Sequence, residues 1–155
     1  MTIPSSIIDY LNKSQINYSV ISHTHGRPSQ QAVPQGEPIT PDKLARAVIL
    51  KDAKGYVMAV LPADKVVNLN SVARQLGRTM VIASESGFPQ IFNECRPGAI
   101  PPIGPAYGME TLLDASFVGR SAIYFEAGDH NELIVMNGDN FLQLLKHARH
   151  GHYCK

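Results

Sequence analysis

The chain has 155 residues and a mass of 16.9 kDa, with 44% hydrophobic and 17% charged residues, the size and composition of one globular domain with its own core. Fourteen Lys and Arg residues oppose 13 Asp and Glu residues, and this net charge of +1 excludes a strongly basic surface that binds nucleic acid by phosphate neutralisation alone. No stretch approaches the roughly 20 apolar residues of a membrane span, no secretory signal starts the chain, and two cysteines make no disulfide framework. These features predict a cytoplasmic protein with no membrane partner.

The first predicted elements are a short helix and an edge strand. Hydroxyl residues at 5 and 6 precede apolar residues at helical spacing, which predicts a capped helix over 5–11. The helical pattern ends by Asn17. Alternation over 18–22 is typical of an edge strand. Four prolines and two glycines between 26 and 41 indicate a loop. The apolar runs 47–50 and 56–61 flank a turn, and we expect a hairpin of two buried strands there.

The middle of the chain alternates short elements with turn residues. Residues 70–77 predict a capped helix that ends at Gly77, residues 79–83 a strand, and residues 84–92 another short helix. The segment 96–108 contains so many Pro and Gly residues that we expect neither helix nor strand, but a shaped loop.

The C-terminal third predicts three further strands, over 112–114, 121–125 and 132–136, with the last turn at 128–131. A capped helix follows over 137–145. Because helices and strands mix without strict βαβ alternation, the predicted class is α+β: a single domain with a mixed, mostly antiparallel sheet flanked by short helices.

The last residues carry several possible metal ligands. His147 and His150 have a spacing that could place them on one helical face, with His152 and Cys154 close behind. Chain ends are more often disordered than functional, so we expect a frayed tail and no metal site.

The most unusual local sequence lies between residues 98 and 108. Its glycines permit positive φ and close backbone approach, and its prolines fix the path and remove N–H donors. Such a loop can present fixed carbonyl and amide groups to a ligand, although ordinary turn chemistry explains the same composition.

Five segments, in this order and spacing, resemble the YbaK/prolyl-tRNA-synthetase-associated domain family: they are residues 44–52, 59–62, 76–77, 98–104 and 114–117. The most specific element is the Gly-x-x-x-Pro loop from Gly98 to Pro102, and the resemblance covers nearly the whole chain. Residues 92–95 and 128–130 look like the branch also found fused to HDOD signalling domains. The resemblance implies a mixed-sheet α+β fold and a single deacylase domain over 1–155 that hydrolyses mischarged aminoacyl-tRNA.

The implied mechanism fits a chain without a strong nucleophile constellation, since no Ser lies in a Gly-x-Ser-x-Gly elbow. A positioned water cleaves the ester, the loop backbone holds the aminoacyl carbonyl, and neither a metal nor a cofactor is required. The implied partner is the acceptor end of aminoacyl-tRNA, and DNA is not expected. The resemblance assigns catalysis to Arg46, Gly98, Ala99 and Pro102, and substrate binding in the same loop to Ile100, Pro101 and Gly104.

Arg46 departs from the family pattern, because relatives carry a lysine at the matching position. Arginine keeps the charge but replaces a compact ammonium with a larger planar group. Lys51 matches a second, more peripheral lysine of the pattern and is a further substrate-binding candidate. Either cation could instead simply reach solvent beside its strand. The arginine motivates an alternative function, a catalytically lapsed domain that binds an amino-acid-like ligand as a sensor.

The remaining substrate-binding candidates lie in turns. In relatives a helix near residues 30–36 borders the pocket, whereas Pro34 and Gly36 interrupt it here. His23, His25 and Ser29 precede this segment and could touch the ribose or the amino acid, although solvation explains them equally well. Relatives have a pocket-lining acid where Asp114 stands, but Asp114 and Ser116 also fit a cap, and His130 fits an ordinary turn.

Overall fold

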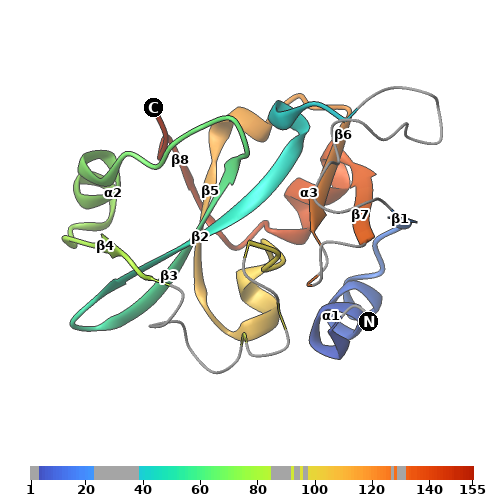
Figure 1. The fold of residues 1–155 in the computed structure, drawn as a ribbon, viewed down its shortest axis with the longest axis horizontal. Coiled ribbons are helices and arrows are strands. Elements are labelled where there is room, and N and C mark those ends of the chain that lie inside the picture. Colours follow the sequence, from blue (N-terminus) through green and yellow to red (C-terminus); the bar gives the residue numbers. More distant parts are fainter. Residues whose placement is uncertain are drawn as a thin grey trace.

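The computed structural model describes residues 4–22, 39–84, 92, 95, 98–126, 128 and 132–155. Within these residues the chain forms a single domain with a mixed sheet and three short helices (Figure 1). The helices are α1 (Ser5–Ser14), α2 (Leu69–Leu76) and α3 (Gly138–Leu144), with short 3₁₀ turns η2 (Pro41–Lys43), η5 (Gly104–Tyr107) and η6 (Ala115–Phe117). The strands are β1 (Ser19–Ser22), β2 (Leu44–Asp52), β3 (Gly55–Pro62), β4 (Val81–Ile82), β5 (Glu110–Asp114), β6 (Ala122–Glu126), β7 (Glu132–Asn137) and β8 (Arg149–Gly151).

The strands form one sheet in the order β1-β7-β6-β2-β3-β5-β8, and β4 pairs with β2 beside this path. The β1–β7, β6–β7, β2–β3 and β2–β4 pairs are antiparallel, whereas β2–β6, β3–β5 and β5–β8 are parallel. The longest ladder is the antiparallel β2–β3 hairpin. The prediction of an α+β domain with a mixed, mostly antiparallel sheet is confirmed.

The β2–β3 hairpin is fixed at its turn by one carboxylate. Asp52 Oδ1 accepts hydrogen bonds from the backbone N–H groups of Lys54 and Gly55, at 2.9 and 3.1 Å. The Arg78 guanidinium binds the same carboxylate through Nε and Nη2, at 2.8 and 2.7 Å. The hydrogen bond from Arg78 holds the pKa of Asp52 far below its ordinary value. The turn is therefore tied to the loop that follows α2.

Side chains alternate across β2 and β3, so the sheet has a core on each face. On one face α1, α3, η5 and η6 cover the main cluster, whose members include Ala45, Ile49, Met58, Val60 and Phe125. On the other face α2 and the C-terminal residues cover a second cluster, called here the α2 cluster, with Val48, Leu61, Val72 and Tyr153. A third cluster, around Ile39 and Tyr124, lies where β6 and β7 face away from the main cluster.

Helix caps agree with the sequence only in part. α3 begins as predicted, since the Asn137 side chain accepts a hydrogen bond from the Asn140 backbone N–H at 2.7 Å. α2 ends at Gly77 in the left-handed conformation, also as predicted, but its cap is Asn68 and not Asn70. α1 begins after Pro4 without a side-chain cap, so the hydroxyl cap expected at Ser5 or Ser6 is wrong.

Two other expectations need correction in extent. The predicted strand over 79–83 is reduced to β4, two residues long. The segment 96–108 is not wholly irregular, because residues 104–107 form η5, which Gly108 ends with φ of 66°. Most of the helix expected over 84–92, the interrupted helix near 30–36 and most of the turn at 128–131 lie outside the described residues.

The predicted frayed tail is wrong. β8 adds a parallel strand to β5, and Tyr153 is completely buried in the α2 cluster. The backbone of Asn68 donates to the Tyr153 carbonyl at 2.7 Å, and Gln75 Nε2 donates to the His152 carbonyl at 2.7 Å. α3 ends at Leu144, so His147 and His150 do not share a helical face. The tail is an integral part of the sheet and of the core beneath α2.

Candidate functional site

The loop 98–102 passes from an exposed glycine into the core. Gly98 is exposed and has a φ of 79°, a left-handed conformation that side chains with a Cβ rarely adopt. Ala99, Ile100, Pro101 and Pro102 are all buried. Since the two prolines have no N–H, only the first three residues of this loop can donate a backbone hydrogen bond.

Gly104 has a packing role that explains its residue type. A Cβ on Gly104 would lie 1.9 Å from Thr111 Oγ1 and 3.1 Å from the Met109 carbonyl oxygen. Thr111 is buried on β5, and its hydroxyl donates to the Met109 carbonyl at 2.9 Å. Gly104 thus lets the loop approach β5 closely, and the predicted substrate contact at Gly104 stays a prediction.

Arg46 lies on the sheet face opposite to the one on which the apolar side chains of the loop pack. Its strand neighbours Ala45 and Ala47 contact the main cluster, which also contains Ile100 and Ile103. Arg46 alternates with them and pairs across the hairpin with Leu61 of the α2 cluster. The structure therefore separates the Arg46 side chain from the apolar side chains of the loop.

One backbone carbonyl binds the Arg46 guanidinium at one of its terminal nitrogens. Nη2 donates to the Lys65 carbonyl at 2.7 Å, and within the described residues Nε is buried without a hydrogen-bond partner. Lys51 is half-buried and pairs with Tyr56 and Val81. Five residues along one strand put the two side chains on opposite faces, with their backbones about 17 Å apart. The structure does not bring Lys51 to Arg46.

Asp114 lies on the same sheet face as Arg46. Leu61 pairs with Arg46 on one side, and the β3–β5 register places Asp114 beside Leu61 on its other side. Two strand spacings separate the backbones of Arg46 and Asp114 by about 10 Å. The Asp114 carboxylate is buried: Oδ1 accepts from the Tyr153 backbone N–H at 2.8 Å, and Oδ2 accepts from the Ser116 N–H at 3.0 Å and from the Ser116 hydroxyl. Both oxygens are thus engaged in capping η6 and fastening the tail.

These contacts set the protonation of two neighbouring groups. Burial alone would raise the pKa of Asp114, but the hydrogen bonds from Ser116 and Tyr153 outweigh it, so the pKa of Asp114 lies below its ordinary value. Burial raises the pKa of the Cys154 thiol to about 11, and a hydrogen bond with Asp114 adds to the shift. Cys154 is therefore a neutral thiol at physiological pH.

Four candidate residues, His23, His25, Ser29 and His130, lie outside the described residues. Their predicted contacts with substrate stay predictions, as does the binding role of Ser116. Over the part of the chain that the structure describes, no group of three or more His, Cys, Asp or Glu side chains could hold a metal ion. In the same residues no helix is both long enough and apolar enough to span a bilayer.

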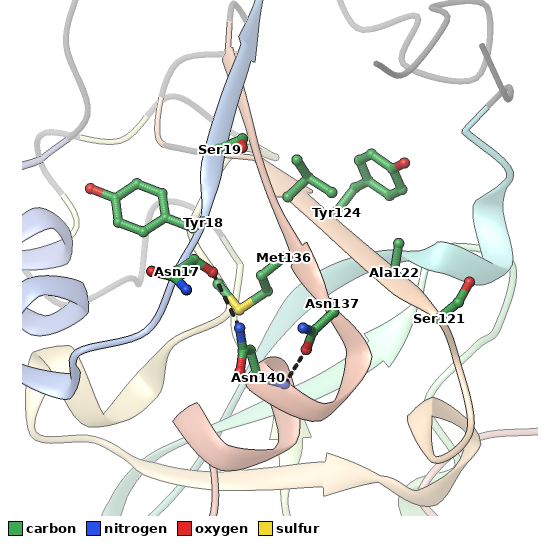
Figure 2. A pocket seen from close by; sticks show the side chains of 10 residues that line it. Asn17, Tyr18, Ser19, Ser121, Ala122, Tyr124, Met136, Asn137 and Asn140 are labelled. Carbon is green, nitrogen blue, oxygen red and sulfur yellow. Dashed lines mark hydrogen bonds between the residues drawn. The ribbon is translucent and has the colours of Figure 1, made fainter. Parts of the chain in front are cut away.

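A polar groove that the sequence did not reveal opens where β1, β6, β7 and α3 meet (Figure 2). Its volume is about 540 Å³, and its lining residues are Asn17, Tyr18, Ser19, Ser121, Ala122, Tyr124, Val135, Met136, Asn137 and Asn140. Figure 2 shows the three asparagines gathered at the start of α3, and we call this feature the asparagine groove. Only the capping pattern of Asn137 was visible in the sequence, and it predicts a helix start without indicating a groove.

The chain is similar to several solved structures at identities that show the fold alone. A proposed signal transduction protein from Marinobacter aquaeolei VT8 matches 99% of the chain with a TM-score of 0.75 and 20% identity, and the chain spans 31% of that protein's length. A hypothetical protein matches 97% of the chain over 99% of its own length, with a TM-score of 0.78 and 16% identity. A proposed trans-editing enzyme for prolyl-tRNA synthetase matches 100% of the chain over 99% of its own length, with a TM-score of 0.76 and 14% identity.

A search of curated proteins found no match. The model of the aminoacyl-tRNA editing domain family, in contrast, matches residues 24–144, which is most of the chain. This region contains β2, the loop 98–102 and all the predicted site residues except His23. With the fold predicted from the resemblance also present, the chain belongs to the aminoacyl-tRNA editing domain family.

Proposed function

We propose that this chain, over residues 1–155, is a trans-editing hydrolase that cleaves the ester bond of mischarged aminoacyl-tRNA. Membership of the editing-domain family supports the substrate class. The observation that carries the proposal is the loop 98–102, in which a glycine at positive φ leads into a buried path fixed by two prolines. Such a backbone is preorganised before substrate arrives, which is the condition for electrostatic stabilisation of a developing charge.

The proposed reaction is direct hydrolysis by water. The water oxygen bonds to the aminoacyl carbonyl carbon, and the resulting oxyanion accepts hydrogen bonds from backbone N–H groups among Gly98, Ala99 and Ile100. The bond between the carbonyl carbon and the ribose oxygen then breaks, and the ribose oxygen takes up a proton that the water gives up. The products are a free amino acid and a tRNA with a free terminal hydroxyl. A neighbouring ribose hydroxyl assists by orienting the water.

Arg46 supplies positive charge to the reacting end of the substrate in this proposal. Its Nη2 is held by the Lys65 carbonyl, which fixes the guanidinium. Because the apolar side chains of the loop pack on the opposite sheet face, Arg46 acts on the nucleotide side of the ester and the loop backbone on the carbonyl. Pro102 fixes the loop path and makes no hydrogen bond to the oxyanion.

The proposed partner is the acceptor end of tRNA rather than the whole molecule. A net charge of +1 provides too weak a field to hold the full tRNA body. Charged tRNA is present in the cytoplasm, which is where we place the activity. The finer assignment to the branch found with HDOD domains stays a prediction.

One observation favours a second candidate function, a lapsed domain that binds an amino-acid-like ligand. Arg46 replaces the lysine that the resemblance implies, and its guanidinium already binds the Lys65 carbonyl. A cation engaged in this way can still attract a carboxylate or phosphate without promoting chemistry.

Deacylation assays with purified protein and a panel of mischarged tRNAs separate the two functions. The trans-editing proposal expects release of the amino acid from at least one member, at a rate above spontaneous hydrolysis. A panel with no turnover, together with retained binding of an aminoacyl-adenosine analogue, would support the sensor and reject the hydrolase. The same panel identifies the amino acid that is removed. Several amino acids must be compared, because a pocket discriminates between side chains that differ by one methylene by only about 1–3 kcal/mol.

A further inference from the structure

The asparagine groove has the size and chemistry of a site for a neutral, planar, hydrogen-bonding ligand. Its volume of about 540 Å³ lies in the range of small-molecule sites. Among the described residues, its ten lining residues include no Asp, Glu, Lys, Arg or His side chain. Asparagine, serine and tyrosine side chains provide both donors and acceptors, whereas Ala122, Val135 and Met136 provide apolar contact. Nucleobases combine an apolar face with donor and acceptor edges, and asparagine amides read such edges.

The side chains of Asn137 and Asn140 each bond to a backbone group. The Asn140 backbone N–H donates to Asn137 Oδ1 at 2.7 Å, which caps α3. Within the described residues, the hydrogen bond of the Asn140 side chain is a long contact, 3.4 Å, to the Asn17 backbone carbonyl (Figure 2). A ligand can displace this contact at little cost, because 3.4 Å is at the weak end of hydrogen bonding.

One arginine lies next in sequence to a lining residue of the groove. Arg120 precedes the lining residue Ser121, and its Nη1 lies 3.1 Å from Asp42 Oδ2. Within the described residues its Nε is buried and has no hydrogen-bond partner. The β2–β6 register pairs Leu44 with Tyr124, so η2, which carries Asp42, runs beside Ala122. A lining residue of the neutral groove is thus preceded in sequence by one partly exposed guanidinium that an acidic side chain already holds on one side.

One side of the groove, at Tyr124, shares a sheet face with Arg46. Tyr124 lines the groove, pairs with Leu44 and belongs with it to the Ile39 cluster. Arg46 follows Leu44 by two residues, so its side chain points to the same face about 7 Å further along the strand. The strand spacings separate the amides of Asn17 and Asn140 from the Arg46 backbone by about 20 Å, so an RNA end with its terminal nucleoside at Arg46 would reach the groove with a nucleotide further upstream.

We propose that the asparagine groove binds an unpaired nucleotide of the tRNA 3′ end, upstream of the aminoacylated nucleoside. The base lies against the amides of Asn17 and Asn140, and its phosphate lies at Arg120. This inference rests on the proposed function for the identity of the RNA, and it adds a subsite that anchors the acceptor end away from the ester.

The test measures binding of two RNA hairpins by fluorescence anisotropy. One carries the unpaired 3′ end with an amide-linked amino acid, and the other lacks the unpaired end. The variant is the double substitution Asn17→Ala with Asn140→Ala, which leaves both the α3 cap and the Asn17 carbonyl in place. The matched control is Asn70→Ala, an exposed asparagine in the first turn of α2.

We expect the double variant to bind the tailed hairpin about tenfold more weakly than the unsubstituted protein. Its affinity for the hairpin without the tail should stay unchanged, as should both affinities of Asn70→Ala. Cytidine monophosphate added to unsubstituted protein should shift the NMR side-chain amide signals of Asn17 and Asn140. An equal loss of affinity for both hairpins, or no loss of affinity for the tailed hairpin, would overturn the inference. Side-chain amide signals that do not shift when the nucleotide is added would overturn it as well.

The two proposals fail separately. If no mischarged tRNA is deacylated while the double variant selectively loses the tailed hairpin, the hydrolase is rejected and the groove is supported. If deacylation proceeds with the KM of the double variant unchanged, the groove is rejected and the hydrolase is supported. A thermal melt of the double variant verifies that it is folded, and the nucleotide titration requires no variant.

Discussion

At the scale of single residues, the two proposed catalytic features depend on different properties. Gly98 depends on backbone freedom, since its φ of 79° is in the region that glycine alone occupies without strain. Arg46 depends on charge and on which sheet face its side chain reaches. A glycine requirement is readable from a motif, whereas the face reached by Arg46 follows from the β2–β3 register.

Gly98→Val should abolish deacylation and leave a folded domain, because a β-branched residue resists positive φ in a segment whose first residue is exposed. Initial rates of deacylation together with a thermal melt measure both effects. Gly77→Val is the matched control, since Gly77 also has a positive φ, 69°, but ends α2. A Gly98→Val protein that keeps most of its rate would remove the loop from the catalytic site.

Arg46→Ala should lower kcat/KM at least tenfold, which corresponds to about 1.4 kcal/mol of transition-state stabilisation. Arg46→Lys should preserve or raise the rate, because the ammonium keeps the charge and relatives carry lysine at this position. Steady-state kinetics on the best mischarged tRNA provide the comparison. Equal kcat/KM for unsubstituted protein and Arg46→Ala would place Arg46 outside the site.

At the scale of elements, the C-terminal segment contributes most to what the sequence did not predict. β8 is short and polar, and its stability comes from pairing with β5 and from the anchor Tyr153 under α2. Gly151 is required by this packing, because a Cβ there would lie 2.0 Å from Gln75 Oε1. The segment also supplies the N–H group that binds Asp114, so strand β5 and the tail stabilise one another.

Tyr153→Ala should destabilise the domain by about 3–5 kcal/mol, the cost of removing a large buried aromatic side chain. Urea unfolding followed by circular dichroism gives the free energy of unfolding. Tyr56→Ala, at an exposed position on the hairpin, should change it by less than about 1 kcal/mol. Similar losses for the two variants would argue against the tail as a core element.

Asp114→Asn should lower stability by about 1–3 kcal/mol at pH 7, because an amide replaces a carboxylate that accepts from Tyr153 and Ser116. The folded-state pKa of Asp114 is depressed, so its contribution is complete above the unfolded-state value of about 3.9. It is lost as the pH falls through the lower folded-state pKa. The difference in free energy of unfolding between the unsubstituted and Asp114→Asn proteins, from urea unfolding at several pH values, should therefore shrink below about pH 4. A difference that does not change with pH would contradict this account.

At the scale of the whole molecule, one sheet separates two cores and divides the site residues between its faces. The loop side chains Ile100 and Ile103 pack in the main cluster, while Arg46, Asp114 and the Tyr124 side of the asparagine groove belong to the opposite face. A substrate that touches both Arg46 and the loop must therefore contact the loop at its backbone, as the proposed mechanism requires. A single-stranded RNA end can enter such a site, because it is thin and flexible.

Binding of a non-hydrolysable aminoacyl-tRNA should depend only weakly on salt. Each neutralised phosphate contributes about −0.7 to −0.9 to the slope of log affinity against log salt concentration, so two or three phosphates give a slope near −2. A net charge of +1 agrees with so few contacts. Titrations from low to moderate salt, with full tRNA and an acceptor-stem hairpin in parallel, measure the slope. A much steeper slope, or a hairpin bound about a hundredfold more weakly, would reveal an extended RNA surface.

The sequence by itself determined the features that depend on neighbours along the chain. Apolar periodicity predicted α1 and the β2–β3 hairpin, a glycine predicted the end of α2, and Asn137 predicted the start of α3. The ordered motifs around Gly98 and Pro102 indicated the family that the match over 24–144 then showed. These signals are local, because caps, turns and strand alternation are decided within a few residues.

Tertiary structure alone decided the features that join distant segments. Tyr153 meets Asp114 across 39 positions, and the order of the tail comes from burial beneath α2, which no pattern in a polar segment predicts. The asparagine groove combines the end of β1 with β6, β7 and α3, and its members become neighbours only when β7 pairs with both strands. Arg46 was identified by its motif, but its sheet face and its bond to Lys65 follow from strand register, since a slip of one residue would turn its side chain to the other core.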